Sequence, residues 1–126
     1  MYKVKRLVKT GEFNANGYKF ESESLKKALD KYIEEEGGYL LKPYSDSYAE
    51  SLEERGEILP EYIVGKIDNY DDDYIYVKEV DKDFEDIVKS ENTTCQLEIL
   101  ASDLINDADN RYICIIEKVN QIRLVV

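Results

Sequence analysis

The sequence predicts one α+β domain over residues 1–126, with a mainly antiparallel sheet of about six strands and two or three helices. The chain has 126 residues, of which 43% are hydrophobic, and this is enough apolar material for one core. Strand-like runs follow one another across turns, without the regular alternation of strand and helix that a parallel sheet needs. No linker rich in Gly, Ser or Pro divides the chain, so we expect a single domain.

Two short elements are expected before the first helix. The stretch Tyr2 to Lys9 reads as a strand with a basic outer side, because Val4, Leu7 and Val8 are mixed with Lys and Arg. The stretch Asn14 to Gly17 reads Asn-Ala-Asn-Gly, and Asn-Gly favours a turn because both residues tolerate a positive φ. A strand and then a turn are therefore expected here.

The most regular pattern in the chain is a helix that begins near Ser22 or Ser24. Its apolar residues follow the i, i+3, i+4, i+7, i+8 spacing: Leu25, Ala28, Leu29, Tyr32 and Ile33. Either serine can cap the helix by accepting a hydrogen bond from a backbone amide of the first turn. The pair Gly37 and Gly38 predicts the end of the helix, because glycine readily adopts the left-handed conformation of a C-cap.

The segment after this helix predicts little regular structure. A short apolar run from Tyr39 ends at Pro43, and the polar stretch Ser45 to Gly56 holds at most a short helix around Tyr48 to Arg55. A loop of this length is unusual in a compact domain, and long loops are more often functional than merely connecting.

Strand-like sequence dominates after Pro60. The runs Tyr62 to Ile67 and Tyr74 to Val80, separated by a turn at Asp68 to Asp73, predict a β-hairpin. The remaining expected elements are a short helix capped by Asp81 with Phe84, Ile87 and Val88 inward, a strand Thr94–Ala101, a polar loop Ser102–Asn110, a strand Tyr112–Val119, a turn Asn120–Gln121 and a strand Ile122–Val126.

The charge of the chain restricts its partners. The sequence has 17 Lys and Arg against 28 Asp and Glu, which gives a formal net charge of -11. This charge repels phosphate backbones and anionic lipid, so it disfavours direct nucleic-acid binding and suits a basic protein partner. No apolar run approaches the ~18 residues that span a bilayer, so no membrane segment is expected. We expect a cytoplasmic protein.

The chemistry of the side chains argues against a conventional enzyme. Histidine is absent, which removes the usual general base near neutral pH and every catalytic triad that contains His. Cys95 and Cys114 both stand in apolar, strand-like runs. We interpret them as reduced core cysteines in a reducing compartment, with a disulfide or a reactive thiol as the alternative.

Two clusters rich in Asp and Asn, Asp68 to Asp73 and Asp103 to Asn110, raise the question of a metal site. Oxygen ligands of this kind suit calcium or magnesium. Neither cluster has the spacing of an EF-hand loop, and turn chemistry explains both. There is also no Gly-rich loop that would hold a phosphate, so we expect neither metal nor cofactor.

The predicted contact surface combines an acidic hairpin tip with a polar segment that carries tyrosines. Its residues are Tyr44, Tyr48, Tyr70, Asp71, Asp72, Asp73 and Tyr74. Tyrosine supplies contact area and a hydrogen-bonding end at protein interfaces. Consecutive aspartates repel one another unless water or a cation offsets the repulsion. The tip therefore predicts contact with a basic partner, and a freely solvated turn is the alternative.

The stretch Asn14 to Phe20 reads Asn-Ala-Asn-Gly-Tyr-Lys-Phe and precedes the helix residues Leu25, Ala28, Leu29 and Tyr32. This order resembles the opening of the tailed-phage prohead proteases, the capsid maturation proteases, which begin with an Asn-x-Asn-Gly turn, an aromatic residue and a helix. The likeness covers the first third of the chain, and beyond that only the order of elements. The resemblance implies a similar fold.

The catalytic residues of that family are not matched. Its His usually stands just before a Pro shortly after the helix, where this chain has Lys42 before Pro43. Its Ser nucleophile follows a later helix and leads into a strand, where this chain has Thr93, Thr94 and Cys95. A lysine of lowered pKa can act as a base, but no apolar pocket for Lys42 is evident in the sequence. The resemblance thus implies a fold that has lost proteolysis.

Together these observations predict a non-enzymatic phage or prophage protein that acts through protein–protein contacts in particle assembly, on a fold like that of the prohead proteases. Its partner is then a basic protein such as a capsid or scaffold protein, and it is found in the host cytoplasm or the virion. The alternative is a small acidic inhibitor of a host nuclease or restriction system, whose carboxylates stand where nucleic-acid phosphates would stand.

Overall fold

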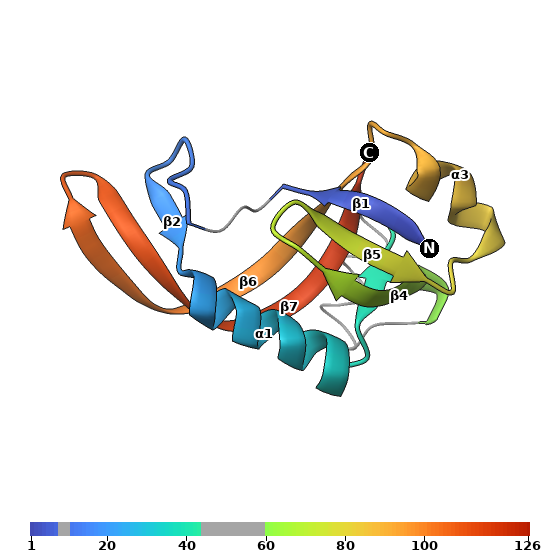
Figure 1. Ribbon diagram of the computed structural model, residues 1–126, viewed down its shortest axis with the longest axis horizontal. Helices are drawn as coiled ribbons and strands as arrows, with labels where there is room; N and C mark the ends of the chain where they lie inside the picture. Colours follow the sequence, from blue (N-terminus) through green and yellow to red (C-terminus); the bar gives the residue numbers. More distant parts are fainter. Residues whose placement is uncertain (8–10, 44–59) are drawn as a thin grey trace.

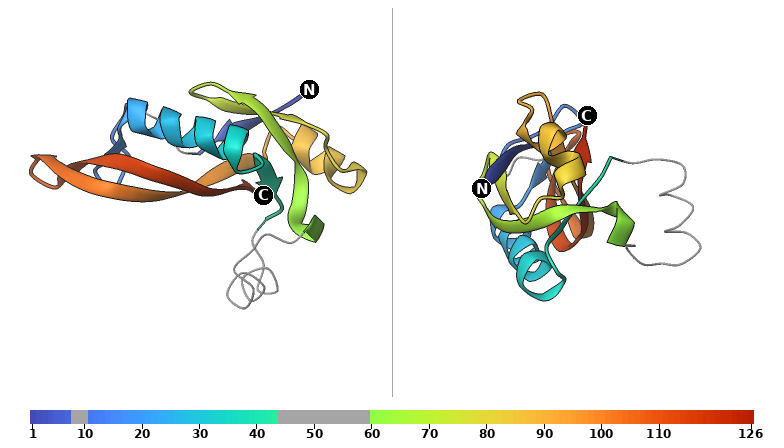
Figure 2. Two further views of the ribbon diagram at one scale, coloured as in Figure 1. Left: turned by 90° about the horizontal axis from the view of Figure 1, so that it is seen from below. Right: turned by 90° about the vertical axis from the view of Figure 1, so that its right-hand side faces the viewer.

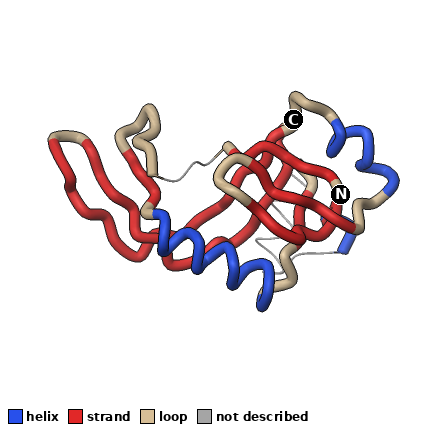
Figure 3. Tube along the Cα trace, viewed as in Figure 1, coloured by secondary structure: helices blue, strands red, loops and turns tan. Residues whose placement is uncertain are grey.

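The computed structural model describes residues 1–7, 11–43 and 60–126, which form one α+β domain (Figure 1). Its strands are β1 (Tyr2–Arg6), β2 (Tyr18–Phe20), β3 (Tyr39–Leu41), β4 (Ile63–Tyr70), β5 (Tyr74–Lys78), β6 (Thr94–Ala108) and β7 (Arg111–Val125). Its helices are α1 (Ser22–Glu35) and α3 (Glu85–Lys89), with short 3-10 turns η1 (Pro60–Tyr62) and η2 (Lys82–Phe84). Strands make up most of the described chain (Figure 3).

The sheet closes on itself, which the expectation of a mainly antiparallel sheet did not include. The strand order is β7-β3-β4-β5-β1-β6, and β6 pairs back to β7, while β2 adds to β7 outside this ring. The β1–β5, β3–β4, β4–β5 and β6–β7 pairs are antiparallel, and the β1–β6, β2–β7 and β3–β7 pairs are parallel. The described domain is therefore a mixed barrel, and the α+β class is confirmed.

Helix α1 lies against β7 and closes one side of the barrel core (Figure 2). Of its predicted inward residues, Leu25, Ala28, Leu29 and Tyr32 are buried, and Ile33 is partly buried against the core. The serine caps are wrong, because Glu21 is the N-cap and its carboxylate accepts from the backbone N of Ser24 at 2.6 Å. The hydroxyl of Ser24 instead accepts from the backbone N of Ile116 at 2.9 Å, and this fixes the helix to β7.

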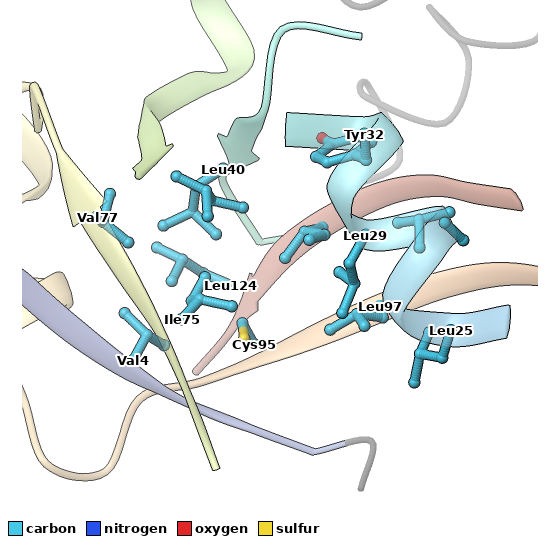
Figure 4. Close-up of a cluster of buried hydrophobic side chains, with 14 of the residues drawn as sticks. Val4, Leu25, Leu29, Tyr32, Leu40, Ile75, Val77, Cys95, Leu97 and Leu124 are labelled. Atoms are coloured by element: carbon cyan, nitrogen blue, oxygen red, sulfur yellow. The ribbon is translucent and has the colours of Figure 1, made fainter. Parts of the chain in front are cut away.

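The core fills the barrel and the space under α1 (Figure 4). Fully buried side chains come from nearly every element, and they include Val4, Leu25, Leu29, Tyr32, Leu40, Ile75, Val77, Cys95, Leu97 and Leu124. In β1 the side chains alternate, so that Val4 and Arg6 are buried while Lys3 and Lys5 are exposed. The predicted basic outer side of this strand is confirmed for the lysines and wrong for Arg6.

Strands β6 and β7 form a long hairpin whose end projects beyond the barrel (Figures 1 and 2). The predicted loop Ser102–Asn110 and turn Asn120–Gln121 are wrong, because β6 continues to Ala108 and β7 runs without a break from Arg111 to Val125. The register shifts at several points along the pair, which marks β-bulges. The prediction failed because an exposed, bulged hairpin is rich in polar residues, as a loop is.

Other predicted elements are confirmed with shifted ends. The β4–β5 hairpin has a shorter turn than expected, since β4 continues to Tyr70 past a register shift near Asp68. Asp81 caps η2, its side chain accepting from the backbone N of Asp83 at 2.9 Å. The predicted short helix around Tyr48 to Arg55 lies outside the described residues.

Candidate functional site

Two of the predicted contact residues, Tyr70 and Tyr74, join the β4–β5 tip to neighbouring elements. The hydroxyl of Tyr70 donates to Oδ1 of Asp30 at 2.7 Å and approaches the backbone O of Lys26 at 3.3 Å, so the tip is attached to α1. Burial, together with this bond to Asp30, raises the pKa of Tyr70 well above its ordinary value. The ring of Tyr74 lies under Nζ of Lys3, 4.6 Å from its centroid.

Asp71 organises the turn through its carboxylate. Its Oδ1 accepts from the backbone N of Asp73 at 2.9 Å and of Tyr74 at 2.8 Å, and its Oδ2 accepts from the hydroxyl of Tyr76 at 2.5 Å. The bond from Tyr76, followed by the two backbone bonds, lowers the pKa of Asp71. Donors within the turn therefore offset part of the repulsion among the aspartates.

Asp72 and Asp73 complete the tip, and both are exposed. Tyr44 and Tyr48, the other two members of the predicted surface, lie outside the described residues. That these seven residues contact a basic partner together stays a prediction.

Acid titration should reveal the role of Asp71. A carboxyl group whose pKa is depressed in the folded state stabilises the fold above its unfolded pKa, and loses this contribution as the pH falls through the folded value. We expect Asp71→Asn to unfold more easily than the wild type at neutral pH, with the difference vanishing well below the ordinary carboxyl pKa of 3.8. Urea unfolding over an acid pH series measures it, and Tyr76→Phe should reproduce part of the effect. A difference that stays constant from neutral to strongly acidic pH would contradict this role.

Arg6 is the unexpected member of this region. Its side chain is 2% exposed, and its Nη1 donates to the backbone O of Asp71, while its backbone N donates to the O of Asp73 at 2.8 Å. Its Nε and Nη2 are buried and have no hydrogen-bond partner among the described residues. Burial lowers the pKa of the guanidinium, and the nearby Cys95 and Asp72 oppose that shift. The alternation of β1 places Arg6 on the same face as the core residue Val4, which is the signal that sequence reasoning missed.

A cavity of about 260 Å³ adjoins Arg6, between the beginning of α1 and the β4–β5 tip. Its lining residues are Arg6, Ser22, Leu25, Lys26, Leu29, Tyr70, Asp71 and Asp72. A second, larger cleft of about 590 Å³ lies on the basic outer side of β1 and includes Lys3, Lys5 and Lys89. The first cavity thus has a buried cation in its wall, and the second has exposed cations.

Lys42, Thr93 and Cys95 stand where the prohead proteases have catalytic residues, and their surroundings do not activate them. Thr93 and Cys95 are buried. Burial raises the pKa of Cys95 to about 12 and also raises that of Cys114, so both thiols stay protonated. Neither cysteine is in a disulfide, in agreement with the expected reduced state. Nζ of Lys42 lies 4.5 Å from the ring centroid of Tyr62, a cation–π contact.

The projecting end of the β6–β7 hairpin exposes large apolar side chains. Leu100, Leu104 and Ile105 are each about half exposed. Among the described residues, β1 pairs with β6 only at Thr94 and Cys95, and the stretch from Leu100 to Ala108 pairs only with β7. Sequence reasoning missed this surface because it ended the strand at Ala101 and assigned Leu104 and Ile105 to a loop.

One backbone amide marks the outer edge of this stretch. The backbone N of Leu104 donates to Oδ1 of Asp103, its own neighbour, at 2.8 Å. The amide therefore points away from β7, toward the side of β6 on which no other described strand lies. A strand added at this edge can take over the hydrogen bond.

The Asn-Ala-Asn-Gly turn supports the opposite edge of the hairpin. Strand β2 pairs with β7, and the ring of Tyr18 stacks on that of Tyr112 with 5.8 Å between centroids. The backbone O of Gly17 accepts from the N of Tyr112 at 2.8 Å. The guanidinium of Arg111 lies 3.7 Å from the ring centroid of Phe13. The motif on which the family resemblance rests is thus part of the scaffold of the projecting hairpin.

The described residues offer neither a cluster of metal ligands nor a helix suited to a membrane. The described residues contain no group of three or more His, Cys, Asp or Glu side chains placed to hold a metal ion. Within the same part of the chain, every helix is too short or too polar to cross a membrane. No family model, curated protein or solved structure matches the chain.

Proposed function

We propose that the protein has no enzymatic activity and acts by binding another protein along the outer edge of β6, residues Leu100 to Ala108. One observation carries the proposal: a long strand edge, unpaired by any described strand, carries the exposed apolar residues Leu100, Leu104 and Ile105. An extended segment that adds to such an edge gains main-chain hydrogen bonds, and the apolar side chains add contact area.

The composition of β6 supports a binding role for its edge. Proteins usually protect edge strands by keeping them short or by placing Lys or Pro in them. Strand β6 has 15 residues with neither Lys, Arg nor Pro, although its bulges interrupt the edge. The absence of Lys, Arg and Pro from so long an edge strand is understandable if a partner covers the edge for part of the time.

The charge of the edge selects the kind of partner. Strand β6 carries Glu98, Asp103 and Asp107, and the whole chain has a net charge of -11. Glu98 is paired with Arg123, its Oε2 lying 2.9 Å from Nη1, which leaves the two aspartates beside the exposed apolar residues. Two copies of this edge would bring like charges together. We therefore propose a partner segment that is extended, basic and apolar at alternate positions.

The biological setting of this contact is proposed from the family resemblance. A prohead-protease-like fold without a catalytic His suits a part in particle assembly, with a basic segment of capsid or scaffold protein as the partner. The low reactivity of the two buried thiols is compatible with a binding role. Inhibition of a nuclease or restriction system remains the second candidate, and the partner that is captured distinguishes the two.

The test removes one outward hydrogen-bond donor from the edge of β6 and leaves the strand in place. Because the amide of Leu104 points away from β7, Leu104→Pro should keep the β6–β7 pairing and remove one outward donor. We expect a ten-residue peptide of alternating Lys and Val to shift the NMR signals of residues 100–108, and Leu104→Pro to weaken its binding by about tenfold. Leu104→Ala is the matched control, since it removes the same side chain and keeps the donor.

Two results would overturn the proposal. Equal binding by the Pro and Ala variants would show that the edge is not used, and equal binding of the corresponding Glu and Val peptide would show that charge does not select the partner. Affinity capture of lysate proteins on the wild-type protein and on the Leu104→Pro variant then distinguishes particle assembly from nuclease inhibition. Virion proteins lost from the Pro bait support assembly, whereas a nuclease or restriction subunit lost from it supports the inhibitor.

A further inference from the structure

We propose that the cleft on the outer side of β1 binds a compact polyanion of the diphosphate class. The cleft has a volume of about 590 Å³ and lies between β1, the start of β5 and the end of α3. Helix α3 lies beside β1, on the part of the barrel away from the projecting end of β6 (Figure 1). Binding in this cleft does not depend on the function proposed for the β6 edge.

The charge of this cleft is opposite to that of the chain. Three lysines line it, Lys3, Lys5 and Lys89, against one acid, Glu91, whereas the whole chain has a net charge of -11. All three lysines are exposed, and none of them forms an ion pair with a described residue. Their positive charges are therefore available to a ligand. Like charges that converge on one concave surface repel one another, and an anion between them would offset this repulsion.

Two of the lysines are held over tyrosine rings that also line the cleft. Nζ of Lys3 lies 4.6 Å from the ring centroid of Tyr74. Nζ of Lys89 lies 5.5 Å from the ring centroid of Tyr2, so both lysines form cation–π contacts. Lys5 is the cross-strand partner of Tyr74, so it stands on the same face as that ring. Lysines that are already restricted in this way lose less side-chain entropy when an anion binds.

The small extent of the basic surface limits the size of the ligand. Exposed acids stand on the segments that lead into the cleft: Asp72 and Asp73 at the β4–β5 tip, and Asp83 and Asp86 between β5 and the end of α3. A nucleic acid or a long acidic peptide would extend over these acids and be repelled. A compact anion keeps its whole charge within the cleft, and the volume of the cleft is in the range of small-molecule sites.

The donors in the cleft favour phosphate over carboxylate. A lysine ammonium is a compact charge with three donors, and it can meet the oxygens of a phosphate from several directions. A carboxylate is bound best by the paired N–H groups of an arginine, and the described residues that line the cleft include no arginine. One phosphate ester carries a charge of about -2 at neutral pH, so three lysines match two linked phosphates better than one.

The experiment is an NMR titration of the ¹⁵N-labelled protein with inorganic pyrophosphate at constant ionic strength. We expect saturable shifts of the backbone signals of Lys3, Lys5, Tyr74 and Lys89, with binding about tenfold tighter than that of phosphate or sulfate. A single-stranded thymidine oligonucleotide should bind more weakly than pyrophosphate, because it extends over the acidic surface. ADP carries the same diphosphate group, so tighter binding of ADP would assign the group to a nucleotide, and tighter binding of pyrophosphate to the free ion.

Variants that change one charge locate the binding site. Lys5→Gln and Lys89→Gln should each weaken pyrophosphate binding by about fivefold. Lys31→Gln is the matched control, since it removes the same charge from an exposed position of α1 outside the cleft and should bind like the wild type. Glu91→Gln removes the acid of the cleft and should tighten binding by about threefold. All four positions are exposed, so we expect these variants to keep the fold.

Three outcomes would contradict a diphosphate site in this cleft. Weakening by Lys31→Gln equal to that by the cleft variants would show a general attraction of anions to exposed lysines. Phosphate or sulfate binding as tightly as pyrophosphate would show that the three lysines do not act together on one ligand. An oligonucleotide that binds more tightly than pyrophosphate would show that the surrounding acids do not limit the size of the ligand.

Discussion

Replacing Gly17 with alanine should lower the free energy of unfolding by about 3 kcal/mol. The backbone of Gly17 has a φ of +81°, a region that disfavours side chains, and a Cβ built there would collide with the backbone O of Asn110. Asn110 lies in the turn of the projecting hairpin, so neither backbone can move without breaking the bond from Tyr112 to Gly17. Urea unfolding followed by circular dichroism measures the change.

The Gly11→Ala variant is the control that measures the cost of a positive φ alone, without a steric clash. Gly11 has a similar φ of +74°, but the nearest atom to its added Cβ would be Oγ of Ser22 at 3.8 Å, an ordinary contact. We expect this variant to lose only the ~1 kcal/mol of the left-handed conformation. Equal losses in the two variants would contradict the close packing of the Gly17 turn on the hairpin.

Leu29→Ala should have a comparable effect in the core. Leu29 is 1% exposed and packs in the main cluster beneath α1 (Figure 4). Truncation of a fully buried leucine removes its transfer free energy and leaves a cavity, which together lower the free energy of unfolding by ~2–5 kcal/mol. The loss should be visible as a lower urea midpoint with an unchanged slope.

Leu104→Ala is the matched control for this core variant. Leu104 is 51% exposed on the projecting hairpin, so the same truncation there should change stability by no more than ~0.5 kcal/mol. A loss at Leu104 as large as the loss at Leu29 would mean that the hairpin is covered in solution. Association of the protein with itself would be the first explanation to examine, by sedimentation.

Local patterns in the sequence predicted the elements whose burial has a regular period. Helix α1 was predictable because one face is apolar over its whole length, and its end follows from the positive φ of Gly37 and Gly38. The β4–β5 hairpin was predictable because its two strands are neighbours in sequence. The parallel pairs of β1 with β6 and of β3 with β7 join distant segments, and nothing local encodes them.

The candidate sites were harder to predict because they depend on where elements meet. The attachment of Tyr70 to α1 is a contact across the fold, because its partner Asp30 lies 40 positions earlier in the sequence. Arg6 looked like a surface residue because charged side chains are rarely buried. The end of β6 looked like a loop because both of its faces are exposed, which removes the alternation that identifies a strand.

The closing contact of the barrel has a consequence for how the chain folds. Lys5 pairs with Thr94 and Arg6 with Cys95, so the ring is completed by segments almost ninety residues apart in sequence. Contacts between such distant segments require the closure of long loops before any interaction rewards it, and folds rich in them fold slowly. On the ribosome, β1 must wait for β6 to be synthesised before it can pair on that side. The β4–β5 hairpin, whose strands are close in sequence, can form first, and the barrel then closes late, when its first strand meets one of its last.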